Sequence, residues 1–213
     1  LRQAMLGELK GEWFLNLDAD NWIEPDFLEK AWAVVERNRE NGRLAFVYPD
    51  RVDFGDYDRP NPSPEFDVAR FKRGNFVDMN SLIRMEAARR HGFDPAFNDG
   101  WGDYDFFLTL AKNGWVGERM KESRLHYRVH RGSITGATAE ADRKQGLMRR
   151  IAAKHADFFS PEEARQAIRR FSPEAVLRYR VCEQVWAGHY LRAAGMVLRL
   201  LVTNPRAIYS VFR

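Results

Sequence analysis

Residues 11–21 read Gly-Glu-Trp-Phe-Leu-Asn-Leu-Asp-Ala-Asp-Asn, and this stretch decides the fold class. The run from Trp13 to Leu17 is short and mostly apolar after a glycine, which predicts a buried strand. Asp18 and Asp20 follow at its carboxyl end, where open α/β sheets bind their ligands. Two carboxylates at this spacing can share one hard divalent cation, with water and substrate phosphates as the other ligands. An acidic turn that caps the next helix gives the same pattern, so the motif alone leaves both interpretations open.

The segments that follow alternate between strand and helix patterns. The sequence predicts strands over 44–48, 76–83, 115–120 and 125–130, and helices over 25–41, 85–91 and 103–113. In the first helix, one apolar face is predicted from Phe27, Leu28, Ala31, Trp32 and Val35. Residues 49–64 contain four prolines and no periodicity, which predicts a loop. This alternation is typical of an α/β sheet with flanking helices.

From about residue 137 the chain changes to arginine-rich helical patterns. Ser160-Pro161-Glu162-Glu163 has the form of a capping box. Ser172-Pro173 opens a longer helix, which Asn204-Pro205 is expected to end. We therefore predict an α/β domain over residues 1–136 and a C-terminal all-helical appendage over residues 137–213.

Charge follows the same division. Residues 137–213 hold 14 Lys+Arg against 7 Asp+Glu, a net charge of +7, whereas residues 1–136 hold 20 against 23, a net charge of −3. The basic helices have two open interpretations: they pack on their own body or on another chain in an oligomer, or they contact anionic lipid with snorkelling arginines. Polyanion binding ranks below both, because interleaved exposed aromatics and nucleic-acid motifs are lacking, so we expect no nucleic-acid partner.

The composition excludes several other classes. A single cysteine rules out a disulfide framework and a cysteine-based structural zinc site. No run of 18 or more apolar residues occurs, which predicts no membrane span. An EF-hand loop that began at Asp18 would need glycine at position 23, where the chain has Ile23.

Two further groups of residues carry chemistry. Asp103 opens a helix within Trp101-Gly102-Asp103-Tyr104-Asp105, where a carboxylate caps the helix and suits its dipole. His130 ends a strand within Tyr127-Arg128-Val129-His130-Arg131-Gly132-Ser133, beside basic residues. Each group alone has a structural explanation, and a site for an anion or a metal at His130 stays open.

Taken in order, these motifs resemble the inverting glycosyltransferases of family 2, which have the GT-A fold. The resemblance covers about residues 1–135 and rests on four stretches: residues 11–21, residues 75–84 with 92–94, residues 103–114, and residues 127–133. It implies a partial, Rossmann-like GT-A sheet. The family's first half has no counterpart here, and the chain starts within a helical pattern. We therefore expect the C-terminal part of the family's domain, cut from a longer protein and inactive by itself.

The resemblance also implies roles for particular residues. Asp20 would bind a divalent metal, Mn or Mg, with His130 as a further ligand of the metal or of a phosphate. Asp18 and Asn21 would join Asp20 in binding the nucleotide-sugar donor. Asp103 would be the catalytic base. Trp101, Gly102 and Asp105 would lie on the acceptor side. The chain departs from the family twice, with Gly102 where glutamate is usual and Asn21 where aspartate is usual.

The implied function is metal-assisted transfer of a sugar, with inversion, from a nucleoside-diphosphate donor to an acceptor hydroxyl. The acceptor would be a glycan or a lipid-linked molecule, in bacterial glycan, polysaccharide or glycolipid biosynthesis. The expected location is the cytoplasm, with peripheral contact at the inner face of the membrane. The alternative is a non-catalytic module of the same fold that binds a glycan or a protein.

Overall fold

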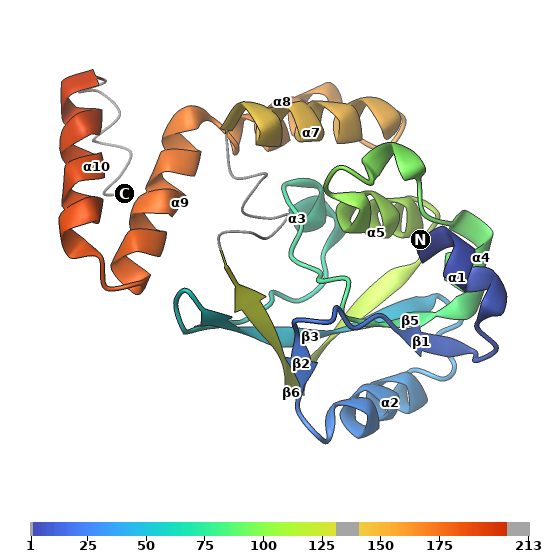
Figure 1. The fold of residues 1–213 in the computed structure, drawn as a ribbon. Helices are drawn as coiled ribbons and strands as arrows, with labels where there is room; N and C mark the ends of the chain where they lie inside the picture. The colour runs from blue at the N-terminus through green and yellow to red at the C-terminus, as the bar shows by residue number, and fades with distance from the viewer. Residues whose placement is uncertain (1, 131–140, 204–213) are drawn as a thin grey trace. The chain divides into compact units, whose positions relative to one another are not determined.

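The computed structural model describes residues 2–130 and 141–203 of the chain. Its contacts divide the chain into two compact units (Figure 1). Unit 1 contains residues 1–53 and 60–128, and unit 2 contains residues 54–59 and 129–213. The domain boundary predicted at residue 136 lies outside the described residues.

Unit 1 is an α/β structure built on one sheet. The strands are β1 (Trp13–Leu15), β2 (Trp22–Ile23), β3 (Leu44–Gly55), β4 (Arg59–Asn61), β5 (Leu82–Arg84) and β6 (Val116–Val129). The sheet order is β1-β5-β3-β6-β2, with β4 paired to β3. The pairs β1–β5, β3–β5 and β2–β6 are antiparallel. This arrangement confirms the predicted class of a sheet with flanking helices.

Helices cover both faces of this sheet (Figure 1). They are α1 (Arg2–Glu8), α2 (Phe27–Arg37), α3 (Val68–Lys72), α4 (Met85–His91) and α5 (Gly102–Lys112), with a 3-10 turn η1 (Pro95–Phe97) before α5. The predictions for α4 and α5 are confirmed to within a residue at each end. Helix α2 is shorter than predicted and ends at Arg37.

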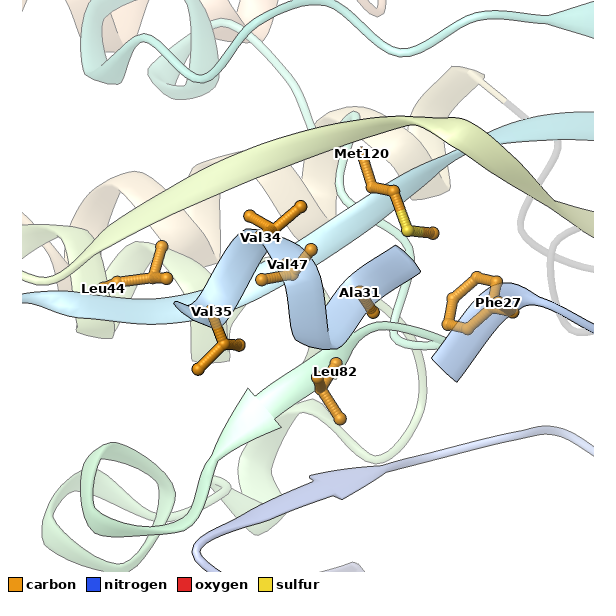
Figure 2. Packing of buried hydrophobic residues seen from close by; sticks show 8 residues of the cluster. All are labelled: Phe27, Ala31, Val34, Val35, Leu44, Val47, Leu82 and Met120. Carbon is orange, nitrogen blue, oxygen red and sulfur yellow. The ribbon is translucent and has the colours of Figure 1, made fainter. Parts of the chain in front are cut away.

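Helix α2 closes the core on one face of the sheet. Figure 2 shows its buried side chains against strand residues from β3, β5 and β6. The cluster consists of Phe27, Ala31, Val34, Val35, Leu44, Val47, Leu82 and Met120. The predicted apolar face was wrong at Leu28 and Trp32, which are exposed. At 100° per residue the buried stripe runs from Val34 through Phe27 and Ala31 to Val35, and Leu28 and Trp32 lie beyond Val35 on the solvent side.

Aromatic rings fill the other face. Phe46 in β3 is fully buried, and its ring lies 4.7 Å from that of Phe107 in α5 and 5.1 Å from that of Phe66. Its neighbour Val47 belongs to the α2 cluster, as expected for a strand whose successive side chains point to opposite faces. The Tyr104 hydroxyl donates to the carbonyl of Phe71 at 2.8 Å, which ties α5 to α3.

The predicted loop over residues 49–64 was wrong. Strand β3 continues to Gly55 and the chain returns as β4. The extension carries charges that are paired across the sheet: Arg119 in β6 makes two hydrogen bonds of 2.7 Å to the Asp50 carboxylate. The Asp50–Arg119 pair, between residues far apart in sequence, thus accompanies an extension of β3 that the local sequence pattern did not predict.

Two other strand predictions were also wrong in extent. Residues 76–83 are strand only from Leu82, and the segments 115–120 and 125–130 form the single strand β6. The polar residues of 75–80 make side-chain contacts instead of ladder bonds, as described below.

Unit 2 contains helices α7 (Ala141–Lys154), α8 (Pro161–Arg169), α9 (Pro173–Trp186) and α10 (Tyr190–Thr203). The capping box is confirmed: the Glu163 N–H donates to Ser160 Oγ at 3.2 Å, and the Ser160 N–H donates to Glu163 Oε2 at 2.7 Å. The long helix predicted after Ser172 is two helices, because Gly188 adopts φ +73° between them. Its predicted end at Asn204-Pro205 falls outside the described part of the chain.

The tip of the β3–β4 hairpin belongs to unit 2 through aromatic contacts. The Tyr57 ring lies 5.5 Å from the Trp186 ring of α9, and the Arg59 guanidinium lies 3.8 Å above Trp186. Among the helices that the structure describes, none is long and apolar enough to cross a membrane.

The packing around Phe46 predicts the effect of one substitution. A Cβ atom at Gly117 would overlap the Phe46 ring, and the ring is confined by its aromatic neighbours. We expect Gly117→Ala to lower the free energy of unfolding by about 1–3 kcal/mol through overpacking. Gly7→Ala in α1 is the control, because no atom lies within 4 Å of its Cβ position. Urea unfolding followed by tryptophan fluorescence measures both, and equal midpoints for Gly117→Ala and the wild type would contradict this packing.

Candidate functional site

The predicted Asp-x-Asp motif forms a turn directly after β1. Asp18 is half-buried and Asp20 is exposed. The Asn21 N–H donates to the Asp18 carbonyl at 3.0 Å, which closes the turn. The Asn21 side-chain oxygen accepts from the Arg128 N–H at 2.9 Å, which ties the turn to β6. The motif therefore has a fixed backbone.

The Asp18 side chain is held by a buried amide. Asn80 has no exposed surface, although it is 62 residues away in sequence. Its Oδ1 accepts from the Asp18 N–H at 2.7 Å, and its Nδ2 donates to Asp18 Oδ2 at 3.1 Å. Asn16 Nδ2 donates to the other oxygen, Oδ1, at 3.3 Å. Both carboxylate oxygens thus have amide donors that fix the orientation of the side chain.

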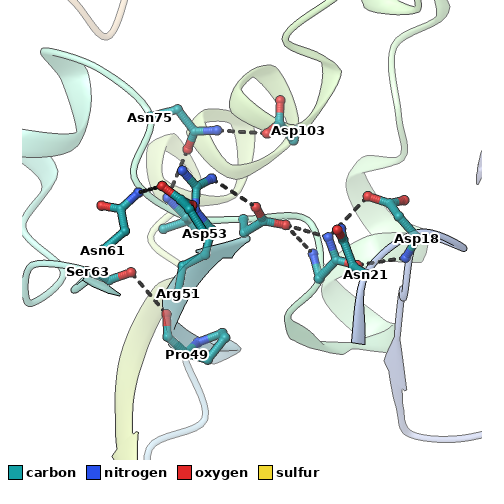
Figure 3. A network of polar contacts seen from close by, with 12 residues as sticks. Asp18, Asn21, Pro49, Arg51, Asp53, Asn61, Ser63, Asn75 and Asp103 are labelled. Carbon is teal, nitrogen blue, oxygen red and sulfur yellow. Dashed lines mark hydrogen bonds and ion pairs between the residues drawn. The ribbon is translucent and has the colours of Figure 1, made fainter. Parts of the chain in front are cut away.

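The same amide continues into a larger polar network. Asn80 Nδ2 also donates to Asp78 Oδ1 at 2.6 Å, and Asp78 Oδ2 lies 3.6 Å from the Arg51 guanidinium. Arg51 forms an ion pair of 2.7 Å with the fully buried Asp53 and lies 4.4 Å above the Tyr127 ring. Figure 3 shows this network, with Asp18 towards one end and Arg51 and Asp53 in its middle.

Asp103, the predicted base, lies in the first turn of α5, where the positive end of the helix dipole favours a carboxylate. Asn75 Nδ2 donates to its Oδ2 at 2.8 Å, and the two side chains point toward one another in Figure 3. Asn75 Oδ1 in turn accepts from the Val77 N–H at 3.1 Å. The six residues 75–80 therefore contact Asp103 at one end and Asp18 at the other.

The predicted acceptor-side residues surround the start of α5. Trp101 has φ +60° and ψ +23°, a left-handed conformation that is uncommon for a tryptophan. Gly102 is tightly placed, because a Cβ atom there would lie 3.1 Å from the Phe97 carbonyl oxygen. The glutamate that is usual at this position would therefore need the η1 turn to move. Asp105 is 1% exposed, so its side chain is buried one turn into α5.

The carboxylates of Asp18 and Asp20 fit a cation that takes only some of its ligands from the protein. Within residues 2–130 and 141–203, no group of three or more His, Cys, Asp or Glu side chains could hold a metal ion. Asp18 and Asp20 supply hard oxygen donors, and Mg²⁺ commonly takes one or two carboxylates with water and substrate phosphates. This donor set suits Mn or Mg bound together with a diphosphate. His130 is half-buried, and its role as a ligand stays a prediction.

Comparison with known proteins finds one matching family. Residues 2–96 match the family model described as glycosyl transferase family 2. The match includes Asp18, Asp20 and Asn80, whereas Asp103 and His130 lie beyond it. No curated protein sequence matched the chain.

Solved structures support the fold of the family domain. TarS of S. aureus has a TM-score of 0.55 at 15% identity, over 80% of this chain and 29% of the TarS chain. The structure of TarS residues 1–349 has a TM-score of 0.52 at 14% identity, over 90% of this chain and 67% of that chain. The chain thus spans about three-tenths of the first of these. At these identities the likeness shows a shared fold, which confirms the predicted GT-A class.

Sequence reasoning missed the residues that position the family motif. The family resemblance included residues 75–84, but no role was predicted for Asn75, Asp78 or Asn80, nor for Arg51. Residues 76–83 were predicted as a strand, and residues 49–64, which include Arg51, as a loop. One signal was present: the segment Asn-Phe-Val-Asp-Met-Asn places three polar residues within a run that a buried strand would keep apolar.

The contacts of Asn80 predict a pH-dependent loss of stability. Asn80→Asp would replace an amide donor with a carboxylate oxygen between Asp18 and Asp78. The new carboxyl would bind its proton more tightly in the folded state than in the unfolded state, so stability must fall as pH rises. We expect the deficit relative to wild type to be larger at about pH 7.5 than at about pH 4.5, close to the ordinary pKa of aspartate.

Asn80→Ala is the matched comparison for this experiment. It leaves buried polar groups unpaired, at a cost of about 1–3 kcal/mol, but it adds no charge. Its deficit should therefore change less between the two pH values. Urea unfolding of the three proteins provides the measurement, and a pH-independent deficit for Asn80→Asp would rule out the crowding of carboxylates.

Proposed function

We propose that the protein is a glycosyltransferase that moves a sugar from a nucleoside-diphosphate donor to an acceptor hydroxyl with inversion. The family match and the GT-A fold support the reaction class. The observation that carries the proposal is that residues 75–80 contact Asp18 through Asn80 and Asp103 through Asn75. One short segment thus links a carboxylate on the donor motif to a carboxylate at a helix start.

Asp103 is the proposed base. The Asn75 amide fixes Oδ2 of the carboxylate, and the position in the first turn of α5 favours its ionised form. Asp103 would take the proton from the acceptor hydroxyl as the oxygen attacks the anomeric carbon. Attack on the face opposite the leaving diphosphate gives inversion. Trp101 and Gly102 would border the acceptor, with Asp105 buried in the first turn of α5.

The turn after β1 is the proposed donor site. Asp18, held by Asn16 and Asn80, would accept hydrogen bonds from the donor's ribose, and Asn21 would border the nucleotide. Asp20, the exposed carboxylate, would bind Mn or Mg together with the diphosphate, and His130 would bind the metal or a phosphate. The cation, when bound, would neutralise charge that grows on the leaving diphosphate.

The wider role that we propose is bacterial glycan, polysaccharide or glycolipid biosynthesis in the cytoplasm, with a glycan or lipid-linked acceptor. The rival hypothesis is a non-catalytic module that binds a glycan or a protein. The two hypotheses differ in one observable: ligand binding by a non-catalytic module should not depend on Asp103 as a proton acceptor.

Substitution of Asp103 tests the base. Asp103→Asn keeps the shape, and its side-chain oxygen can still accept from Asn75 Nδ2, but it removes the proton acceptor. Since general-base catalysis contributes about 10²–10⁴-fold, turnover in the full-length protein should fall by at least about 100-fold while donor affinity changes little. The control is Asp67→Asn, because Asp67 caps α3 by accepting from the Arg70 N–H at 2.7 Å and asparagine can do the same. Normal turnover in Asp103→Asn would place the base elsewhere.

Substitution of Asp20 tests the metal. Asp20→Ala should abolish Mn- or Mg-dependent transfer and the metal-dependent part of nucleoside-diphosphate binding, measured by calorimetry. Because the side chain is exposed, the free energy of unfolding should change by no more than about 0.5 kcal/mol. Asp56→Ala, another exposed loop carboxylate, serves as the control. If Asp20→Ala keeps full activity in the presence of EDTA, Asp20 holds no essential metal.

A further inference from the structure

Helix α10 carries an apolar stripe that faces solvent. Five of its large apolar side chains are exposed, from 40% for Leu201 to 91% for Leu191. The stripe consists of Tyr190, Leu191, Ala194, Leu198, Leu201 and Val202. At about 100° per residue these six lie within roughly a third of the helix circumference. Scattered exposed apolar residues are ordinary, but a continuous stripe of this kind marks an interaction surface.

The rest of the helix divides into two further sectors. Ala193 is 5% exposed and lies on the side opposite the stripe, where α10 packs against α9. Arg192 and Arg199 are exposed and share a sector between the stripe and the packed side. The stripe is therefore not the face that holds α10 in unit 2, and it has a basic border.

We propose that this stripe inserts α10 into the interface of an anionic lipid bilayer, parallel to the membrane plane. Residues 190–203 contain two arginines and no acidic residue, and residues 137–213 carry a net charge of +7. An interfacial helix combines a stripe of leucine and aromatic side chains with flanking arginines, whose charges meet lipid headgroups. The 14-residue helix suits this orientation, because a span needs about 20 residues.

Charge selects lipid over another protein chain as the occupant. A second copy would bring another chain segment with a net charge of +7 against the first, and this repulsion disfavours a contact between copies. Apart from the Tyr190 hydroxyl at one end, the stripe has no polar side chain that could set the register of a protein contact. The proposal is independent of the transferase chemistry, since it concerns binding alone.

Vesicle flotation of the full-length protein tests the proposal. We expect binding to phosphatidylcholine vesicles that contain about 30 mol% phosphatidylglycerol, and weaker binding at about 0.5 M than at about 0.1 M salt, because salt screens the headgroup charge. The double variant Leu191→Asn with Leu198→Asn should lower the partition coefficient at least about tenfold, since each leucine buries apolar surface in the bilayer. Arg192→Gln with Arg199→Gln should lower it about tenfold and remove most of the salt dependence.

The control pair is Leu28→Asn with Val185→Asn, two exposed apolar residues on α2 and α9 that lie outside the stripe. Its binding should match that of the wild type, and circular dichroism should show unchanged helix content in every variant. The proposal is overturned if the wild type does not bind anionic vesicles, or if the stripe variant binds as the control does. A second outcome also overturns it: the wild type does not bind vesicles, light scattering shows that it is a dimer, and the stripe substitutions dissociate that dimer.

Discussion

The amide of Asn80 is the contact on which the site depends. It lies between the carboxylates of Asp18 and Asp78 and gives a hydrogen bond to each, while its oxygen accepts from the Asp18 backbone. Only a neutral group with both donors and an acceptor can satisfy these partners in a buried position. A cationic side chain would lack the acceptor, and an acid would add repulsion. The orientation of Asp18 therefore depends on a residue from a different part of the chain.

The charges of this network support the cation proposed at the donor site. Asp18, Asp53 and Asp78 lie in one network with the guanidinium of Arg51, and Asp20 is two residues from Asp18. The hydrogen bonds from Asn80 and Asn16 stabilise these carboxylates without neutralising them. A diphosphate that approaches them meets like charge, so a divalent cation between the two lowers the cost of binding. The local charges thus support the divalent cation proposed at Asp20.

Sequence patterns predicted the elements whose ends have local signals. Helices α4 and α5 end within a residue of the prediction because Gly92 and Gly114, both with positive φ, follow their last turns. The extent of β3 could not be predicted, since the pairs Asp50–Arg119 and Arg51–Asp53 that stabilise it appear only when the sheet is formed. The carboxylates of the site were visible as motifs in the sequence. Their partners Asn75 and Asn80 were not, because a side chain's distant hydrogen-bond partner leaves no periodic pattern.

Contacts between residues distant in sequence also explain why unit 2 combines two separate segments, residues 54–59 and residues 129–213. Tyr57 and Arg59 contact Trp186 across more than a hundred residues of sequence, so the hairpin tip is held by a helix that follows the sheet. The separation of charge is consistent with the different partners proposed for the two parts of the chain. Residues 1–136 are net acidic and would approach an anionic lipid surface against repulsion, whereas residues 137–213 are net basic. If the acceptor is carried on a lipid, the basic helices would supply the attraction to the membrane that the acidic part lacks. The carboxylates of the acidic part would then bind the diphosphate through the proposed cation and would take no part in membrane binding.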